Sequence, residues 1–242
     1  MKRTALVASA LSLAALTGLT GCGSGDDTAT DTADKPKASA SQAKQVSPAE
    51  GLTKLVVTKT DVDGYEVEKP TADENLTFAK SQDEVTVDRA VCAPLAYAMN
   101  QLPLGDSQAD LTRVASKNNL TTAYTYITLA TYTDGKAESA MADLSKAVSS
   151  CGSGFTAKAN GNSSPYDSVT AETADKAGDE SLAFKSTMTF RGVTHTLHSA
   201  AVRYDDVIAV YFSVNGSAIA ESRPSDAKLP TAVVEAQNSK LG

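Results

Sequence analysis

The strongest constraint on the fold of this chain is the alternation of apolar and polar residues between residues 181 and 214. A period of two is typical of a strand with one face on a core and the other on solvent. Arg191-Gly192 interrupts the alternation and predicts a two-residue turn. Such a turn pairs Phe190 with Val193 in an antiparallel hairpin.

A second turn is predicted at Asp205-Asp206 and continues the hairpin into a third strand. It sets Val210 opposite Ala201 and Phe212 opposite Ser199. The two registers agree, because both bring apolar residues to the same face of the sheet. On the first two strands, the residues predicted to face the core are Leu182, Phe184, Met188, Phe190, Val193, His195, Leu197, Ser199 and Ala201.

Helical periodicity outside this meander predicts a mixed domain. The clearest helix runs from Asp134 to Cys151 and ends at Gly152, while Ser47 and Glu50 form a capping box that opens an earlier helix. The apolar stripe of the clearest helix, interpreted as core, consists of Ala137, Ala140, Met141, Leu144, Ala147, Val148 and Cys151. Further helices are predicted at 47–58, 88–102 and 230–241, and further strands at 120–132, 155–159 and 168–173. We therefore expect an α+β fold, an antiparallel sheet with helices packed on one face.

The start of the chain predicts export. Lys2 and Arg3 precede an apolar stretch from Ala5 to Leu16, which is shorter than the roughly 20 residues that span a bilayer. The stretch leads to Leu19-Thr20-Gly21-Cys22, which resembles a bacterial lipobox. We expect the signal to be removed and Cys22 to carry lipid. The alternative is an ordinary signal peptide that happens to be followed by a cysteine.

This reading divides the chain into three parts. Residues 1–21 form the lipoprotein signal peptide, residues 22–46 the lipidated cysteine and a disordered tether, and residues 47–242 one folded domain. The tether has no large apolar residue before Val46, so it buries too little surface to offset its ordering entropy. Acyl chains on Cys22 would hold the domain at the extracellular face of the cell membrane.

Cys92 and Cys151 are the only cysteines outside the lipobox. An exported chain reaches a compartment where disulfides persist, so we expect these two residues to be bridged. The alternative is a pair of buried free thiols. A bridge over a loop of about 60 residues stabilises by roughly 4 kcal/mol in the chain-entropy model.

The charge of the chain argues against nucleic acid as a partner. The sequence has 22 basic and 29 acidic residues, and removal of Lys2 and Arg3 leaves 20 basic residues and a net charge of −9. Affinity for nucleic acid comes largely from Lys and Arg that neutralise phosphates. A solvated acidic surface is the simpler interpretation.

Few residues can support catalysis or bind a metal. His195 and His198 are the only histidines, and residues three apart on a strand point to opposite faces, so the two cannot share one metal ion. The motifs of zinc proteases, α/β-hydrolases and nucleotide-binding loops are missing, and we expect no cofactor and no catalytic residue. His195 as the base of a serine hydrolase is the alternative to a core histidine satisfied by a hydroxyl or backbone group. Asp61-Val62-Asp63-Gly64 is interpreted as a turn, because the remaining acids of a calcium loop are absent.

The order of these features resembles the PknH-like extracellular sensor domain, a family found on bacterial receptor kinases and in stand-alone lipoproteins. The segments that carry the resemblance are Thr60 to Tyr65, Cys92-Ala93-Pro94-Leu95, the helix that ends at Cys151, and Gly178-Asp179-Glu180-Ser181 before a strand. The chain has Tyr65 where the family commonly has tryptophan, and one cysteine pair where the kinase domain has two.

The resemblance implies a non-catalytic sensor domain that binds a ligand or a protein of the cell envelope. The alternative function is a cell-envelope hydrolase that acts on a wall or lipid component. A binding module needs a groove with apolar walls and a few polar groups. We expect it where the sheet is not covered by the helix from Asp134 to Cys151, although the sequence does not name its residues.

Overall fold

The computed structural model describes residues 46–70, 78–117 and 123–242. A compact unit spans Lys44–Gly242. The predicted signal peptide, the lipid site Cys22 and nearly all of the tether lie outside the described residues.

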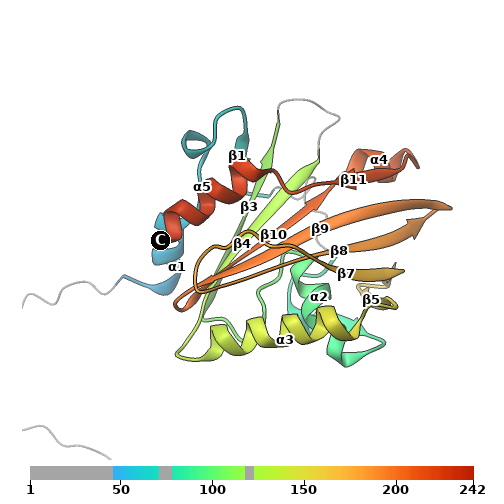
Figure 1. Ribbon diagram of the computed structural model, residues 1–242, viewed down its shortest axis with the longest axis horizontal. Coiled ribbons are helices and arrows are strands. Elements are labelled where there is room, and N and C mark those ends of the chain that lie inside the picture. The colour runs from blue at the N-terminus through green and yellow to red at the C-terminus, as the bar shows by residue number, and fades with distance from the viewer. Residues whose placement is uncertain (1–45, 71–77, 118–122) are drawn as a thin grey trace, which may run out of the picture. The chain divides into compact units, whose positions relative to one another are not determined.

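An eight-stranded sheet forms the centre of this unit (Figure 1). Seven strands follow one another in the order β1-β3-β4-β10-β9-β8-β7, and β11 joins β9 in a parallel pair. Their bounds are β1 (Glu66–Glu68), β3 (Ala109–Ser116), β4 (Tyr124–Thr131), β7 (Ser168–Glu172), β8 (Glu180–Phe190), β9 (Val193–Tyr204), β10 (Val207–Val214) and β11 (Ser225–Ala227). A second sheet consists of β2 (Thr86–Val87), β5 (Phe155–Ala159) and β6 (Asn162–Tyr166).

The predicted hairpin registers are confirmed. Phe190 pairs with Val193 and Val210 with Ala201. Arg191 has a φ of 50° and the following glycine 77°, the left-handed backbone that a tight two-residue turn requires. Phe190 was wrongly predicted to face the core: it is 38% exposed at the tip of the hairpin, under the guanidinium of Arg191.

One face of the main sheet packs against α3 (Lys136–Ser150) and α2 (Ala93–Ala98). The predicted apolar stripe of α3 is confirmed, since all of its members are buried. The helix predicted over 88–102 is shorter: a 3-10 turn, η3 (Ala90–Cys92), leads into α2, which ends at Ala98. Gln101 has a positive φ of 62°, which no helix continues through.

The opposite face of the sheet packs against α1 (Pro48–Leu55) and α5 (Thr231–Leu241). The α+β class and the antiparallel sheet with helices packed on one face are thus confirmed, and α1 and α5 add cover on the other face, which the sequence did not predict. The reason lies in the central strands: Tyr126 and Ala130 of β4 face α3, while Ile127 and Leu129 contact the cluster around α1 and α5. A strand that is apolar on both sides needs cover on both sides.

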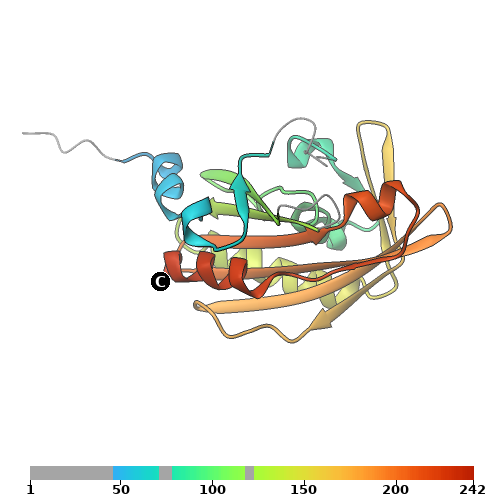
Figure 2. The ribbon, with the colours of Figure 1, turned by 90° about the horizontal axis from the view of Figure 1, so that it is seen from above.

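Both views place α1 and α5 at one end of the molecule and the tip of the β8–β9 hairpin at the other (Figures 1 and 2). The remaining short elements are η1 (Lys59–Asp61), η2 (Gln82–Glu84) and α4 (Gly216–Ala220). The capping box at the start of α1 is confirmed, because Glu50 N donates to Ser47 Oγ and Ser47 N donates to the Glu50 carboxylate.

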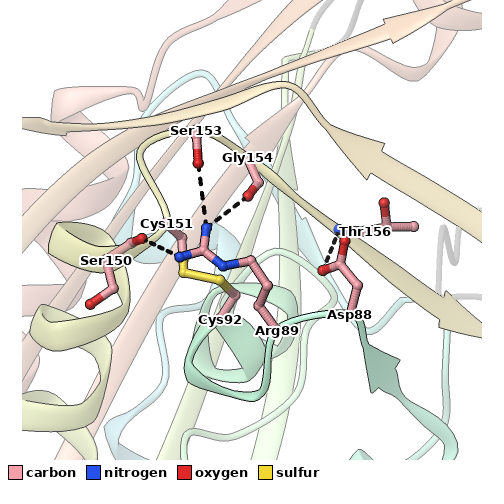
Figure 3. Close-up of a disulfide and its surroundings, with 8 residues drawn as sticks. All are labelled: Asp88, Arg89, Cys92, Ser150, Cys151, Ser153, Gly154 and Thr156. Atoms are coloured by element: carbon pink, nitrogen blue, oxygen red, sulfur yellow. Dashed lines mark hydrogen bonds between the residues drawn. A yellow bond between two sulfur atoms is a disulfide. The ribbon is translucent and has the colours of Figure 1, made fainter.

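The predicted disulfide between Cys92 and Cys151 is confirmed (Figure 3). It joins the end of η3 to the end of α3, with the two Cα atoms 6.0 Å apart. Arg89 lies beside it and donates from Nη2 to the Ser150 carbonyl at 2.7 Å. The bridge therefore fixes both helices on one face of the sheet.

Candidate ligand-binding groove

A groove of about 610 Å³ opens on the sheet face opposite α3. Its floor is formed by β8 and β9, one wall by α5, and the other wall by residues 172–177, the end of β7 and the segment after it. We call it the α5 groove. It lies where the sequence led us to expect a binding site, on sheet surface that the helix from Asp134 to Cys151 does not cover.

The floor is hollow because its side chains are small. Ser181 and Ala183 of β8 and Ala200 of β9 line it, and all three are only partly buried. Ala183 and Ala200 are paired across the two strands, so they lie side by side on one face. Larger side chains at these positions would fill the groove.

Hydrogen bonds on the side of α5 that faces away from the groove fix the position of this helix. Gln237, fully buried, accepts a hydrogen bond from Val57 N at 2.9 Å and donates one to the Leu55 carbonyl at 2.9 Å. Tyr211 donates to Asn238 Oδ1 at 2.6 Å. These bonds tie α5 to the end of α1 and to β10, which keeps the groove open between α5 and β8.

A charged cluster lies at the start of the groove, where β11 leads toward α5. His198 is 4% exposed, and its Nδ1 is 2.7 Å from Glu172 Oε2 while its Nε2 is 2.6 Å from Asp226 Oδ1. Lys228 Nζ lies 3.0 Å from His198 Nε2 and 3.1 Å from Asp226 Oδ2. The hydrogen bond with His198 lowers the pKa of Asp226.

His195 lies on the other face of β9, as the sequence predicted. It is 0% exposed, and its Nδ1 is 3.0 Å from Ser225 Oγ, the hydroxyl partner that we expected for a core histidine. Its buried Nε2 has no hydrogen-bond partner among the described residues. Burial lowers its pKa, which favours the neutral ring. The two histidines therefore point to different environments and do not share a site.

Asp61 belongs to a turn, as predicted. Its Oδ2 accepts from Thr58 N at 2.7 Å and from Lys240 Nζ at 3.0 Å, which ties η1 to the last turn of α5. Within the ranges that the structure describes, no group of three or more His, Cys, Asp or Glu side chains is arranged to hold a metal ion.

Sequence reasoning located the groove but missed its residues. The signal was the solvent-side register of the meander, since Ser181, Ala183 and Ala200 alternate with the predicted core set and are all small. The position of α5 could not be predicted from the sequence, because it depends on a contact between Gln237 and the segment at the end of α1, which is distant in sequence.

The fold has a counterpart among solved structures. The crystal structure of the extracellular domain of PknH from Mycobacterium tuberculosis matches with a TM-score of 0.50 and 10% sequence identity, over 78% of this chain and 91% of that one. The X-ray structure of an uncharacterized protein from Mycobacterium smegmatis, an Rv0999 ortholog, matches with a TM-score of 0.38 and 12% identity, over 74% of this chain and 90% of that one. No family model and no curated protein sequence matches the chain. The resemblance to the PknH-like sensor domain is thus confirmed at the level of the fold.

Proposed function

We propose that this protein is a membrane-anchored extracellular lipoprotein whose domain, residues 47–242, binds a ligand or a protein of the cell envelope without catalysis. The α5 groove carries the proposal, because it combines an apolar floor with a few polar groups at its ends, as binding sites for small molecules do. The fold of the PknH extracellular domain is consistent with such a role.

The proposed anchor is the lipid on Cys22, which follows from the lipobox-like sequence Leu19-Thr20-Gly21-Cys22. Among the described residues no helix is long and apolar enough to cross a membrane. In this proposal the acyl chains on Cys22 make the membrane a partner, and the domain faces the outside of the cell. The net charge of the mature chain argues against nucleic acid as a further partner.

The groove argues for binding over catalysis. Its one histidine, His198, has both ring nitrogens within hydrogen-bond distance of carboxylates, so in the empty groove neither is available to take a proton from a substrate. The alternative function, a cell-envelope hydrolase, is favoured by one contact: Ser225 Oγ and His195 Nδ1 are 3.0 Å apart. Neither Ser225 nor His195 lines the α5 groove.

Native mass spectrometry of the protein extracted from its own cell envelope tests this proposal. We expect a co-purifying ligand on the wild-type chain and its loss in Ala200→Leu, which fills the floor of the groove. Ala171→Leu is the matched control, since Ala171 is an exposed position of the same sheet outside the groove. Turnover of an envelope substrate that His195→Ala abolishes would instead establish the hydrolase.

A further inference from the structure

Two nitrogens, the ammonium of Lys228 and the ring Nε2 of His198, converge on one exposed carboxylate at the start of the α5 groove. His198 Nε2 contacts Oδ1 of Asp226 at 2.6 Å, and Lys228 Nζ contacts its Oδ2 at 3.1 Å. The two nitrogens are 3.0 Å apart, so they address the two oxygens of a single carboxylate from adjacent positions. We call His198 and Lys228 the cation pair. Such an arrangement recognises carboxylate and phosphate groups in general.

The members of this cluster differ in how firmly they are held. The side chain of His198 is 5% exposed and is fixed from behind by Glu172. The side chain of Asp226 is 55% exposed, and the contacts that the structure gives it are those to the cation pair. Asp226 can therefore rotate into solvent while His198 keeps its place, because its carboxylate is exposed and exposed ion pairs hold their partners only weakly.

Charge balance favours replacement by another anion. Among the described residues the ion pair that the structure gives the Lys228 ammonium is the one with Asp226, at 3.1 Å. When Asp226 turns away, this positive charge remains uncompensated beside the largely buried ring of His198. A single anionic group from a ligand restores neutrality in the same position.

We propose that the cation pair is the anion subsite of the α5 groove, that Asp226 occupies it when the groove is empty, and that the ligand is a linear amphiphile with one carboxylate or phosphate head. This inference rests on the proposed function of the groove. His198 and Lys228 both line the groove, so a head group bound to them leaves the rest of the ligand over the floor.

The groove matches the apolar part of such a ligand. From His198 to Tyr204 the floor follows β9 for about 20 Å, at roughly 3.3 Å per residue. Ala183 and Ala200 form its centre, and Leu229 and Val234 face them from the connection to α5 and from α5 itself. An extended alkyl chain fits a long, shallow apolar floor of this kind, and each buried methylene contributes to binding.

Calorimetric titration of the exported chain from Gly23 onward, which keeps the whole compact unit and carries no acyl chain of its own, tests the inference. The probes are decyl phosphate, decyltrimethylammonium and inorganic phosphate, all below their micellar concentrations. We expect decyl phosphate to bind at least about tenfold more tightly than the cationic amphiphile, because charge-assisted contacts to the head are lost with the latter. Inorganic phosphate should bind more weakly still, since it has no apolar part.

Two substitutions separate the anion subsite from a structural role. Lys228→Ala should weaken decyl phosphate binding about tenfold, whereas Lys158→Ala, which removes an exposed lysine of β5 outside the groove, should leave it unchanged. Asp226→Asn should tighten binding several-fold, because it neutralises the internal competitor. If Asp226 had only a structural role, Asp226→Asn would weaken the binding of decyl phosphate.

The outcomes are distinguishable from those of the proposed function. Equal binding of both amphiphiles, abolished by Ala200→Leu, would overturn the anion subsite and leave the groove as a binding site. If inorganic phosphate bound as tightly as decyl phosphate, the inference that the ligand is an amphiphile would be overturned. Binding of neither amphiphile would overturn the inference as a whole, while the ligand that co-purifies from the envelope still decides the proposed function.

Discussion

Arg89 donates a hydrogen bond of 2.7 Å to the backbone carbonyl of Ser150, 61 residues further along the chain, and so caps the last turn of α3 beside the disulfide (Figure 3). The terminal carbonyls of a helix have no partner within the helix. The same guanidinium also reaches the Gly154 carbonyl at 3.3 Å, just past the end of α3. The side chain thus connects the segment before η3 to the turn that leads into β5.

Arg89→Ala should lower the free energy of unfolding by about 1 to 3 kcal/mol, because charged hydrogen bonds to two carbonyls are lost. Urea denaturation with the disulfide intact measures this. Arg89→Lys keeps the charge but not the fork of donors, so it should recover only part of the loss. Equal stability of wild type and Arg89→Ala would show that the bridge alone fixes the end of α3.

Gly154 and Gly152 offer a matched pair of substitutions on either side of that turn. Gly154 has a φ of 83°, and an added Cβ would overlap the Tyr166 carbonyl, whereas at Gly152 the nearest atom to an added Cβ is the Val169 carbonyl oxygen at 3.7 Å. Gly154→Ala should therefore destabilise the fold by roughly 2 kcal/mol or more, and Gly152→Ala by much less. Thermal unfolding of the two variants makes the comparison, and an equal effect would contradict it.

The parts of the fold that were predictable from sequence are those fixed locally. The turn at Arg191-Gly192 determines the register of β8 and β9, and the stripe of α3 determines its buried face, so both predictions are confirmed. The cover on the second sheet face was missed, because α5 has little amphipathic pattern and its position depends on contacts that are distant in sequence, such as the bond from Val57 N to buried Gln237, 180 residues away. Glu172 and Asp226, the acidic partners of His198, were missed because they also lie far from it in the sequence.

Asp61 makes the stability of the domain depend on acid pH. The side-chain hydroxyl of Thr58, the ammonium of Lys240 and the Thr58 amide lower the pKa of Asp61 from 3.8 to about 2. A carboxyl whose pKa is lowered on folding contributes stability above its unfolded pKa and loses it as the pH falls through the folded value. The contribution should thus be complete above about pH 4 and disappear toward pH 2.

Asp61→Asn should lower the unfolding free energy by about 0.5 to 1 kcal/mol at pH 6, since the pair is partly exposed, and should have little effect near pH 2. Urea denaturation at a series of pH values measures the difference. Thr58→Val removes the strongest contribution, so carboxyl-carbon NMR should show the pKa of Asp61 returning toward 3.8. A difference between wild type and Asp61→Asn that is constant with pH would exclude this linkage.

The predicted lipid on Cys22 would determine where the protein resides. If Cys22 carries the predicted acyl chains, Cys22→Ala should convert a membrane-bound product into an uncleaved or soluble one, because the substitution removes the thiol to which the lipid would attach. Metabolic labelling with a clickable fatty acid, followed by membrane fractionation, measures both effects. Cys92→Ala with Cys151→Ala is the matched control: these residues form the disulfide within the domain, so their loss should leave the label in place. Label retained on Cys22→Ala would show that the cysteine follows the signal by chance and that the anchor lies elsewhere.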